Sequence, residues 1–367
     1  MSDRRVHEKR MRKRFHSGRP APDLRRQSAP SEESKIAFVF PGQGSQHVGM
    51  GRQLAAAYPV AAEIFSRADE ILGFSLSRLC FEGPEEELRR TANAQPALLA
   101  CSLATFRVLQ ENGLSAGLLA GHSLGEFTAW VAAGTIGFSA ALPLVRKRGE
   151  LMEEASRRRP GGMLAVLGLE RRTLKHLLDR VREGILVIAN LNCPGQIVVS
   201  GEEAPLRKLR ELVLQEGARA IPLRVSGAFH SPLIEEGARL FEKEIERLNL
   251  APAQPAVVCN VSGRPMKTPQ AIRQAMAAQM TSPVQWEASV HAMAQAGIET
   301  FVEVGPGEVL CGLVSRTLNQ ARVFSTGNPE KLQEVISTFA KKTRPESPNA
   351  QVSSLPVPSE ETAASEF

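Results

Sequence analysis

Short apolar runs alternate with amphipathic stretches along most of the chain, and this order predicts an α/β fold. The run IAFVF at 36–40 stops at Pro-Gly and is typical of a strand that is buried on both faces. The other elements of this part are helices at about 51–72 and 95–111, a strand at 117–120, a helix at about 127–133, and strands at 257–261 and 301–304. Strands and helices that alternate in this way indicate a parallel sheet with helices on both faces.

A second pattern is nested inside the first. Its strands fall at 162–169, 185–190, 196–200 and 219–225, and its helices at 170–182 and 204–215. The order β-α-β-β-α-β is typical of a ferredoxin-like module. We therefore expect a small domain over 161–225, inserted into a larger α/β domain that comprises 35–160 and 226–340.

Charge is concentrated at one end of the chain. The 367 residues carry a formal net charge of +6, but residues 1–34 alone hold ten Lys and Arg against five Asp and Glu. This basic leader is rich in Arg, Ser and Pro, so we expect it to be disordered, as we do the tail at 341–367. Its acidic residues argue against a transit peptide, and a nucleic-acid arm stays an alternative to a passive tail. The near-neutral remainder predicts no nucleic-acid partner.

Hydropathy and cysteine usage narrow the class of protein further. No apolar run reaches about 18 residues, so the sequence predicts no transmembrane helix, and the leader lacks the apolar core of a secretory signal. The five cysteines are widely spaced and form no C-x-x-C pair. This usage predicts a reduced, cytoplasmic protein without a structural metal.

The sequence GHSLG at 121–125 stands between a predicted strand and a predicted helix, which is the context of a nucleophile elbow. The two glycines allow a tight turn, and the start of the helix favours developing negative charge nearby. Ser123 is therefore the candidate nucleophile. The alternative is an ordinary serine in a strand–turn–helix connection.

A serine nucleophile needs a base, and the chain has seven histidines. His230, in GAFHSP, lies where the small module returns to the main sheet and is favoured by elimination. His47 stays possible, whereas His122 points away from its neighbour Ser123 on extended backbone. No acidic residue stands out as a third member, so a backbone or amide carbonyl is expected to orient the base. This absence argues against an ordinary esterase triad.

A glycine-rich loop, FPGQGSQ at 40–46, follows the first strand. It lacks the spacing and the Lys of a phosphate loop. We expect it to supply one backbone N–H of an oxyanion hole, with Leu124 supplying the other.

Five motifs together resemble those of the malonyl-CoA:acyl carrier protein transacylases, which include the acyltransferase domains of fatty acid and polyketide synthases. The motifs are FPGQGSQ, GHSLGE, the KRG at 147–149, AFHSPL and EVGPGEVL. The resemblance covers about residues 35–330. It implies an α/β-hydrolase-like large domain with a parallel sheet, and an inserted ferredoxin-like small domain.

The resemblance also implies a role for individual residues. By this resemblance Ser123 takes the malonyl group, His230 is its base, and Gln43 and Leu124 are the oxyanion-hole donors. Arg148 matches the arginine that binds the free carboxylate of malonate. Gln285, in the Pro-Val-Gln-Trp motif, matches the residue whose backbone carbonyl holds the histidine. The implied substrates are malonyl-CoA and the phosphopantetheine thiol of acyl carrier protein, with no metal and no bound cofactor. Arg219 and Arg224 are possible contacts for an acidic carrier protein. Gly227 leaves the choice between malonyl and methylmalonyl groups open.

The sequence thus predicts an [acyl-carrier-protein] S-malonyltransferase that supplies extender units for fatty acid synthesis. A polyketide-pathway acyltransferase and a proofreading hydrolase of acyl carrier proteins on the same fold are the alternatives. A generic serine esterase is a further alternative, which activity on simple esters undiminished in Arg148→Ala would support. A non-catalytic scaffold subunit is another, and the combination of Ser123, His230 and Arg148 argues against it.

Overall fold

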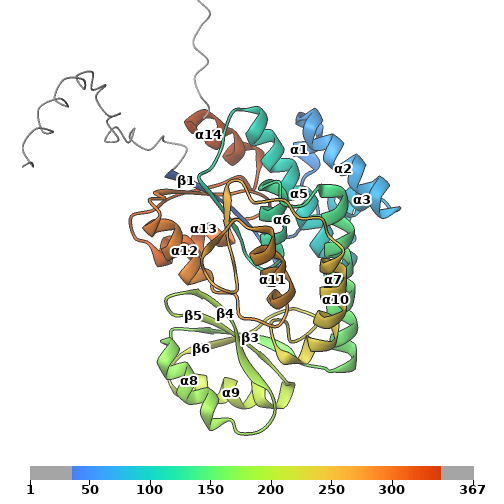
Figure 1. Ribbon diagram of the computed structural model, residues 1–367. Coiled ribbons are helices and arrows are strands. Elements are labelled where there is room, and N and C mark those ends of the chain that lie inside the picture. The colour runs from blue at the N-terminus through green and yellow to red at the C-terminus, as the bar shows by residue number, and fades with distance from the viewer. Residues whose placement is uncertain (1–34, 340–367) are drawn as a thin grey trace, which may run out of the picture.

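A computed structural model describes residues 35–339 of the chain. The expectations for the leader at 1–34 and for the tail at 341–367 lie outside the described residues. Within them, two sheets and their helices form two lobes, a larger one and a smaller one (Figure 1). The predicted mixed α/β class, with a parallel-rich sheet and a separate antiparallel sheet, is confirmed. The residue limits of the two domains stay a prediction.

The larger lobe is built on a sheet of six strands. Their order is β10 (Arg322–Ser325), β9 (Thr300–Glu303), β1 (Ile36–Phe40), β2 (Leu118–Gly121), β7 (Ala256–Val258) and β8 (Pro265–Met266). All neighbouring pairs are parallel except β7 and β8. The carboxyl ends of the parallel strands therefore meet at one edge, which is where ligands bind in open α/β sheets.

Helices cover both faces of this sheet, as the fully buried IAFVF strand predicts. Alternate side chains of β1 enter two different cores: Phe38 and Phe40 join the larger cluster, and Ala37 and Val39 join the smaller one. The helices that contribute to the larger cluster are α2 (Pro59–Leu72), α3 (Leu76–Glu82), α4 (Glu85–Arg89), α5 (Thr91–Glu111), α6 (Leu124–Ala132), α7 (Phe138–Arg158), α10 (Glu235–Glu246), α11 (Pro269–Gln279) and α14 (Pro329–Phe339). The smaller cluster is closed by α12 (Trp286–Gln295) and α13 (Val309–Thr317).

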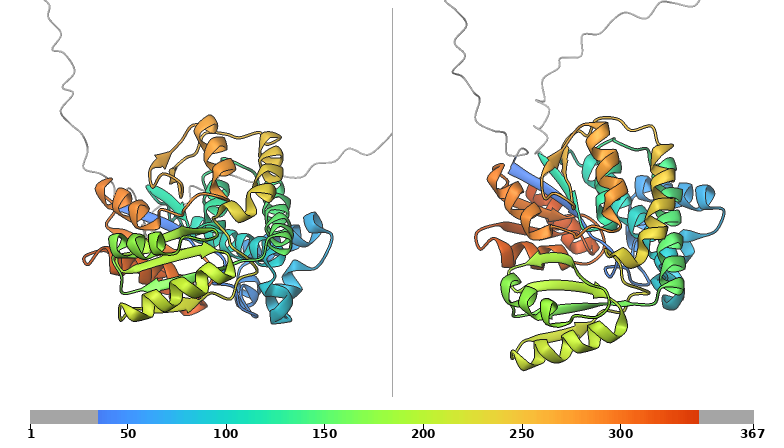
Figure 2. Two further views of the ribbon diagram at one scale, coloured as in Figure 1. Left: turned by 90° about the horizontal axis from the view of Figure 1, so that it is seen from below. Right: turned by 60° about the horizontal axis from the view of Figure 1, so that its bottom comes forward.

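The smaller lobe contains the predicted β-α-β-β-α-β series. Its antiparallel sheet has the order β4 (Leu186–Cys193), β5 (Gln196–Gly201), β3 (Gly162–Leu167) and β6 (Arg219–Pro222), with α8 (Arg171–Arg180) and α9 (Glu203–Gln215) packed on one face. On the opposite face, Met163, Ala165 and Val198 belong to the core cluster of the larger lobe. The sheet therefore forms a wall against the larger lobe (Figure 2).

Two of the helix boundaries that differ from the sequence prediction involve a proline. The stretch at 51–72 divides into α1 (Arg52–Ala57) and α2, because Tyr58 is extended before Pro59. Helix α5 begins at Thr91 rather than near 95, with Pro96 inside it. Pro96 has no N–H for the helix ladder, and the carbonyl of Ala92 instead accepts a hydrogen bond from Nη1 of Arg146 at 3.2 Å.

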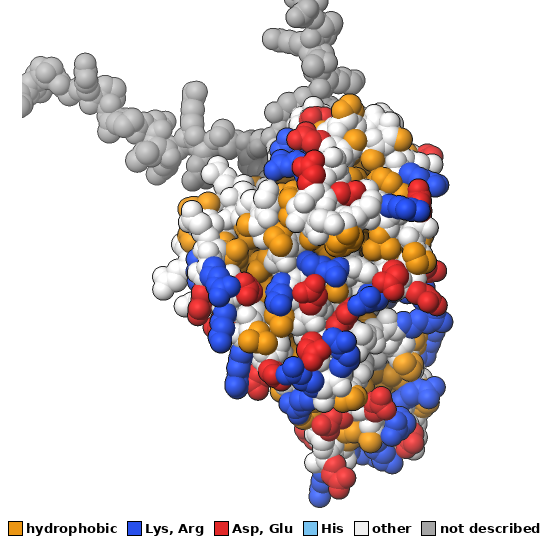
Figure 3. Space-filling view, turned by 90° about the vertical axis from the view of Figure 1, so that its right-hand side faces the viewer, with side chains coloured by type: hydrophobic (Ala, Val, Ile, Leu, Met, Phe, Trp, Pro, Cys, Tyr) orange, Lys and Arg blue, Asp and Glu red, His pale blue; other side chains and the backbone are white. Residues whose placement is uncertain are grey.

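Acidic and basic side chains are interspersed on the face shown in Figure 3. Within the described chain, ion pairs link Arg158 to both Glu154 and Glu236, and Arg239 to Glu235. The face in Figure 3 therefore offers no continuous basic strip of the kind that follows a phosphate backbone.

Candidate active site

Ser123 occupies a strained turn between the end of β2 and the start of α6. Its φ of 50° is in the left-handed region, which residues other than glycine rarely adopt. The flanking glycines permit close backbone approach: a Cβ on Gly121 would lie 2.0 Å from the carbonyl carbon of Gly125, and one on Gly125 would lie 2.0 Å from the oxygen of Phe40. The GxSxG spacing therefore has a geometric cause, and the turn presents Ser123 at the carboxyl edge of the sheet.

Gly121→Ala is expected to destabilise the protein by about 2 kcal/mol or more, because the new methyl group would overlap backbone atoms that cannot move aside. Thermal or urea unfolding measures the effect. Gly312→Ala, in helix α13, is the matched control: its Cβ meets nothing within 4 Å, so the change should be neutral or stabilising. Equal stability of the Gly121 variant and the natural chain would contradict this account of the turn.

His230 lies against the serine. Its Nε2 is 2.8 Å from Oγ of Ser123, and its Nδ1 is 3.0 Å from the carbonyl oxygens of both Gln279 and Ser282. A carbonyl oxygen only accepts hydrogen bonds, so Nδ1 carries the proton and Nε2 is left to accept from the serine hydroxyl. Burial, with smaller effects of Arg148 and His122, lowers the pKa of His230 to about 3. The resting imidazole is therefore a neutral base in the correct tautomer.

The His230 imidazole is expected to stay neutral from about pH 8 down to about pH 5, because a lowered pKa extends the neutral form to more acidic conditions. Nitrogen-15 NMR of histidine-labelled protein checks this, with His230→Asn used to assign the signal. A His230 signal that titrates near an ordinary histidine pKa would contradict it.

Gln285 does not supply the carbonyl that holds His230. Its carbonyl accepts from the Ser289 hydroxyl at 2.9 Å, whereas His230 is held by Gln279, at the end of α11, and by Ser282. The expectation of a backbone carbonyl as the orienting group agrees with this geometry, but the residue assigned to it is corrected. The contact is made by the main chain, so the side-chain type gave no sequence signal.

Arg148 projects from α7 toward Ser123 and is only 1% exposed. Its Nη2 lies 3.3 Å from Oγ of Ser123 and 3.0 Å from Oε1 of Gln279, and its Nη1 lies 2.9 Å from Oε1 of Gln95. Nε has no hydrogen-bond partner within the described chain. Burial lowers the pKa of Arg148 to about 10, opposed by the charge of Glu126, so the guanidinium remains a cation at neutral pH.

The loop after β1 lies beside the elbow. A Cβ on Gly42 would be 2.4 Å from the carbonyl oxygen of His122, so this glycine too is required by close packing. The Gln43 side chain donates to Oγ1 of Thr91 at 3.1 Å, and Leu124 is the first residue of α6. Gln43 and Leu124 line one pocket with Ser123, which is the arrangement expected of oxyanion-hole donors.

This active-site pocket has a volume of about 250 Å³ and lies between the two lobes. Ser123, His230 and Arg148 all line it, opposite Met163 and Val198 of the small sheet. Gly227 lies between two residues that line this pocket, Val225 and Phe229, and a Cβ on it would be 1.8 Å from Oγ of Ser156. A larger residue at 227 would therefore require a change at Ser156.

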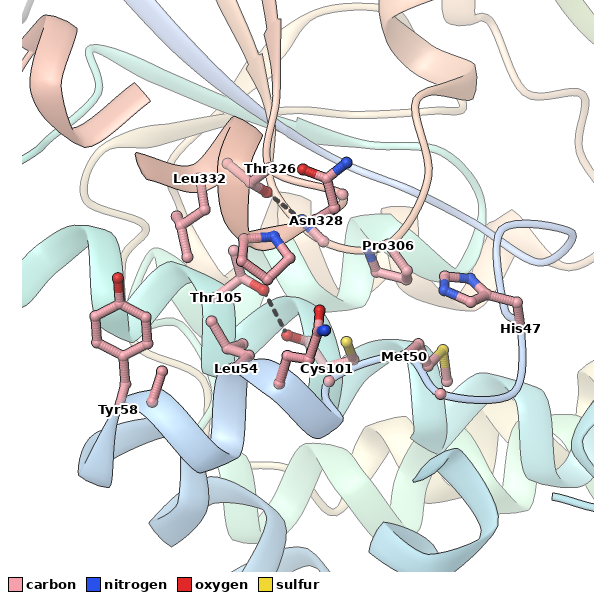
Figure 4. A pocket seen from close by; sticks show the side chains of 17 residues that line it. His47, Met50, Leu54, Tyr58, Cys101, Thr105, Pro306, Thr326, Asn328 and Leu332 are labelled. Atoms are coloured by element: carbon pink, nitrogen blue, oxygen red, sulfur yellow. Dashed lines mark hydrogen bonds between the residues drawn. The ribbon is translucent and has the colours of Figure 1, made fainter. Parts of the chain in front are cut away.

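His47 lies in a different cavity. This second pocket, of about 150 Å³, is formed by the loops after β1, β9 and β10, and its lining includes Met50, Leu54 and Tyr58 (Figure 4). Because His230 already bonds to Ser123, His47 is not needed as the base. His122, the neighbour of the serine, instead bonds to Oδ1 of Asn192, in β4 of the smaller lobe, at 2.9 Å. His176 and His291 are exposed on helices.

Four buried polar residues that the sequence did not single out surround the site. The side chain of Asn260 accepts from the N–H of Ser123 at 2.7 Å and donates to the carbonyl of Gly121 at 2.7 Å, so it stabilises the turn. The other three are Gln95, Glu126 and Gln279, each at most 1% exposed. Arg219 and Arg224, proposed as carrier contacts, are exposed at β6 and just after it.

Two properties of the described residues, 35–339, bear on membrane spanning and on metal binding. In this range no helix is long and apolar enough to cross a bilayer. Within the same range, His, Cys, Asp and Glu nowhere form a group of three that could bind a metal ion.

Comparison with known proteins places the chain in a family. Residues 37–326 match the acyl transferase domain. The chain is 44% identical over 312 residues to malonyl CoA-acyl carrier protein transacylase of Bacillus subtilis, an alignment that covers 84% of this chain and 98% of the relative.

Two solved structures are similar to the whole described fold. Malonyl-CoA:acyl carrier protein transacylase of Xanthomonas oryzae pv. oryzae has a TM-score of 0.82 at 39% identity, covering 84% of this chain and 99% of that one. A malonyl-transacylase in complex with its type II PKS acyl-carrier protein has a TM-score of 0.81 at 38% identity, covering 83% and 100%. Because the match to the domain extends over residues 37–326 and the relatives are similar over almost their whole length, this chain belongs to the acyl transferase family and, within it, to the malonyl-CoA:acyl carrier protein transacylases.

Proposed function

We propose that the protein transfers a malonyl group from malonyl-CoA to the phosphopantetheine thiol of acyl carrier protein, through a malonyl ester on Ser123. The observation that supports this proposal is that three groups meet in one pocket: the Ser123 hydroxyl, the His230 imidazole and the Arg148 guanidinium. No metal or bound cofactor is required by these steps.

In the first half-reaction, Oγ of Ser123 attacks the thioester carbonyl of malonyl-CoA while Nε2 of His230 takes its proton. The N–H groups of Gln43 and Leu124 stabilise the oxyanion of the tetrahedral intermediate. The C–S bond then breaks, and the CoA sulfur leaves with the proton from His230. In the second half-reaction the phosphopantetheine thiol gives its proton to His230, and its sulfur attacks the carbonyl carbon of the malonyl ester. The C–O bond to Ser123 then breaks, and Oγ of Ser123 takes the proton back from His230.

Arg148 selects the acyl group in this scheme. The malonyl carboxylate is two bonds beyond the reacting carbonyl carbon, and Nη2 of Arg148 is already 3.3 Å from the attacking oxygen. A planar guanidinium can donate two parallel hydrogen bonds to a carboxylate. An acetyl group has no such acceptor and would leave this buried cation without a substrate partner.

We propose fatty acid synthesis as the pathway and the cytoplasm as the compartment. The relative at 44% identity carries no pathway in its name, whereas the solved complex contains a type II PKS carrier protein, so a polyketide pathway is the second candidate. All five cysteines are free thiols, which suits a reducing compartment. The exposed Arg219 is our proposed contact for an acidic carrier protein.

The test is the mass of the intact protein after exposure to malonyl-CoA, methylmalonyl-CoA or acetyl-CoA, followed by addition of a holo carrier protein. We expect a malonyl adduct that disappears when the carrier is added and reappears on the carrier. Steady release of CoA from malonyl-CoA without a carrier would favour the hydrolase instead. Parallel assays with a fatty acid and a polyketide carrier protein distinguish the two pathways by their kcat/KM values.

A further inference from the structure

Gln279 forms hydrogen bonds to all three residues Ser123, His230 and Arg148. Its side-chain Oε1 accepts from Arg148 at 3.0 Å, its Nε2 donates to the carbonyl of Ser123 at 2.9 Å, and its backbone carbonyl accepts from His230 at 3.0 Å. The two ends of the side-chain amide have opposite character, so these contacts require one of its two orientations. In the flipped orientation the NH₂ group would face the guanidinium, and the oxygen would face a carbonyl.

Glu126 fixes that orientation. One carboxylate oxygen accepts from Nε2 of Gln279, and the other accepts from the backbone N–H of Asn260 at 3.0 Å. Both neighbours are donors, so an ionised carboxylate, which only accepts, satisfies both. Glu126 is 1% exposed, and burial raises its pKa to about 7. These hydrogen bonds and the charge of Arg148 lower the pKa, but by less than burial raises it.

We propose that Glu126 is a positioning residue that sets the Gln279 amide, and through it the Arg148 guanidinium, for recognition of the substrate carboxylate. Glu126 does not line the active-site pocket, and no step of the reaction passes through it. Its effect on acyl selection is carried by Gln279. The inference rests on the proposed function, because it concerns the choice of the acyl group.

Glu126→Gln tests this with little change of volume. The N–H of Asn260 is part of the main chain and cannot rotate, so it keeps the single oxygen of the new amide. The NH₂ of that amide then faces the NH₂ of Gln279, so the contact that holds the Gln279 amide in place becomes a repulsion between donors. The Gln279 side chain has to move away from residue 126, and its oxygen, which accepts from Arg148, moves with it and displaces the guanidinium.

We expect the ratio of kcat/KM for malonyl-CoA to that for acetyl-CoA, measured for acylation of Ser123, to fall about 10- to 100-fold in Glu126→Gln. This is the range for loss of a hydrogen bond to a charged group. A merely structural role would lower both values by the folded fraction and leave the ratio unchanged. An unchanged ratio in a folded Glu126→Gln protein overturns the proposal.

Glu303→Gln is the matched control. Glu303 is also a fully buried carboxylate, it accepts from the N–H of Cys311 at 2.8 Å, and it does not line the active-site pocket. The ratio should not change in this variant. A fall of the same size as in Glu126→Gln would count against a specific role of Glu126.

Gln279→Met gives a second route if Glu126→Gln does not fold. It removes the amide and keeps the backbone carbonyl that holds His230. We expect the ratio of the two kcat/KM values to fall in Gln279→Met too. Adding Glu126→Gln to Gln279→Met should lower the ratio no further, because Glu126 acts through Gln279. An unchanged ratio in Gln279→Met, or an additive double variant, overturns the proposal. Absence of a malonyl adduct in the natural chain would instead overturn the proposed function.

Discussion

Ser123→Ala is expected to abolish the malonyl adduct and to reduce malonyl transfer by about 10⁴-fold or more. Oγ of Ser123 is the group that His230 contacts at 2.8 Å, at the carboxyl edge of the main sheet. Without it, the remaining oxyanion donors and Arg148 have no ester to stabilise. Intact mass after exposure to malonyl-CoA measures the adduct, and transfer to a holo carrier protein measures the rate.

Ser200→Ala is the control for this loss. Ser200 is also fully buried, but it lies in β5 of the small sheet and does not line the active-site pocket. This variant should keep the adduct and the transfer rate. A malonyl adduct that persists in Ser123→Ala, on any other residue, would show that the elbow is not where the acyl group is held.

The elbow could be predicted from the sequence because its geometry depends on side-chain type. Only glycine fits at 121 and 125, because a Cβ at either position would lie 2.0 Å from backbone atoms. The spacing of the two glycines around Ser123 therefore predicts the turn from the sequence alone. His230 could be found by elimination among few histidines.

Arg148 could not be found in that way. The chain has 45 Lys and Arg, and Arg146 and Lys147 adjoin Arg148, so local sequence does not distinguish it from solvated neighbours. Its 1% exposure depends on α5 and α11 folding over α7, and these contacts span up to 131 positions along the chain. The resemblance to a family supplied what the local pattern lacks.

The misplaced Gln285 shows a second limit. His230 is oriented by main-chain carbonyls of Gln279 and Ser282, and any residue could supply these. Which carbonyls reach the imidazole depends on how the chain turns after α11, and that turn is set by tertiary packing. Side-chain networks such as Glu126, Asn260 and Gln279 are hidden for the same reason, because each contact joins segments far apart in sequence.

Arg148→Ala is expected to lower kcat/KM for malonyl-CoA by about 10²–10⁴-fold and to change that for acetyl-CoA far less. The guanidinium is buried and makes its contacts through both Nη atoms, so the variant loses the one cation that, within the described chain, contacts the reacting oxygen. Acetyl-CoA offers no carboxylate, so it has no interaction with Arg148 to lose. Acylation rates for both thioesters, measured on one protein preparation, give the ratio directly.

Lys147→Ala separates this effect from a general loss of positive charge. Lys147 directly precedes Arg148 on the same helix and is exposed. A change in the long-range attraction of the anionic CoA would therefore appear in both variants, whereas a change in acyl selection would appear only in Arg148→Ala. Equal losses for malonyl-CoA and acetyl-CoA in Arg148→Ala would mean that the guanidinium serves the Ser123 oxygen at 3.3 Å rather than the substrate carboxylate. In that case selection of the acyl group would have to come from the shape of the pocket, with Met163 and Val198 as the facing wall.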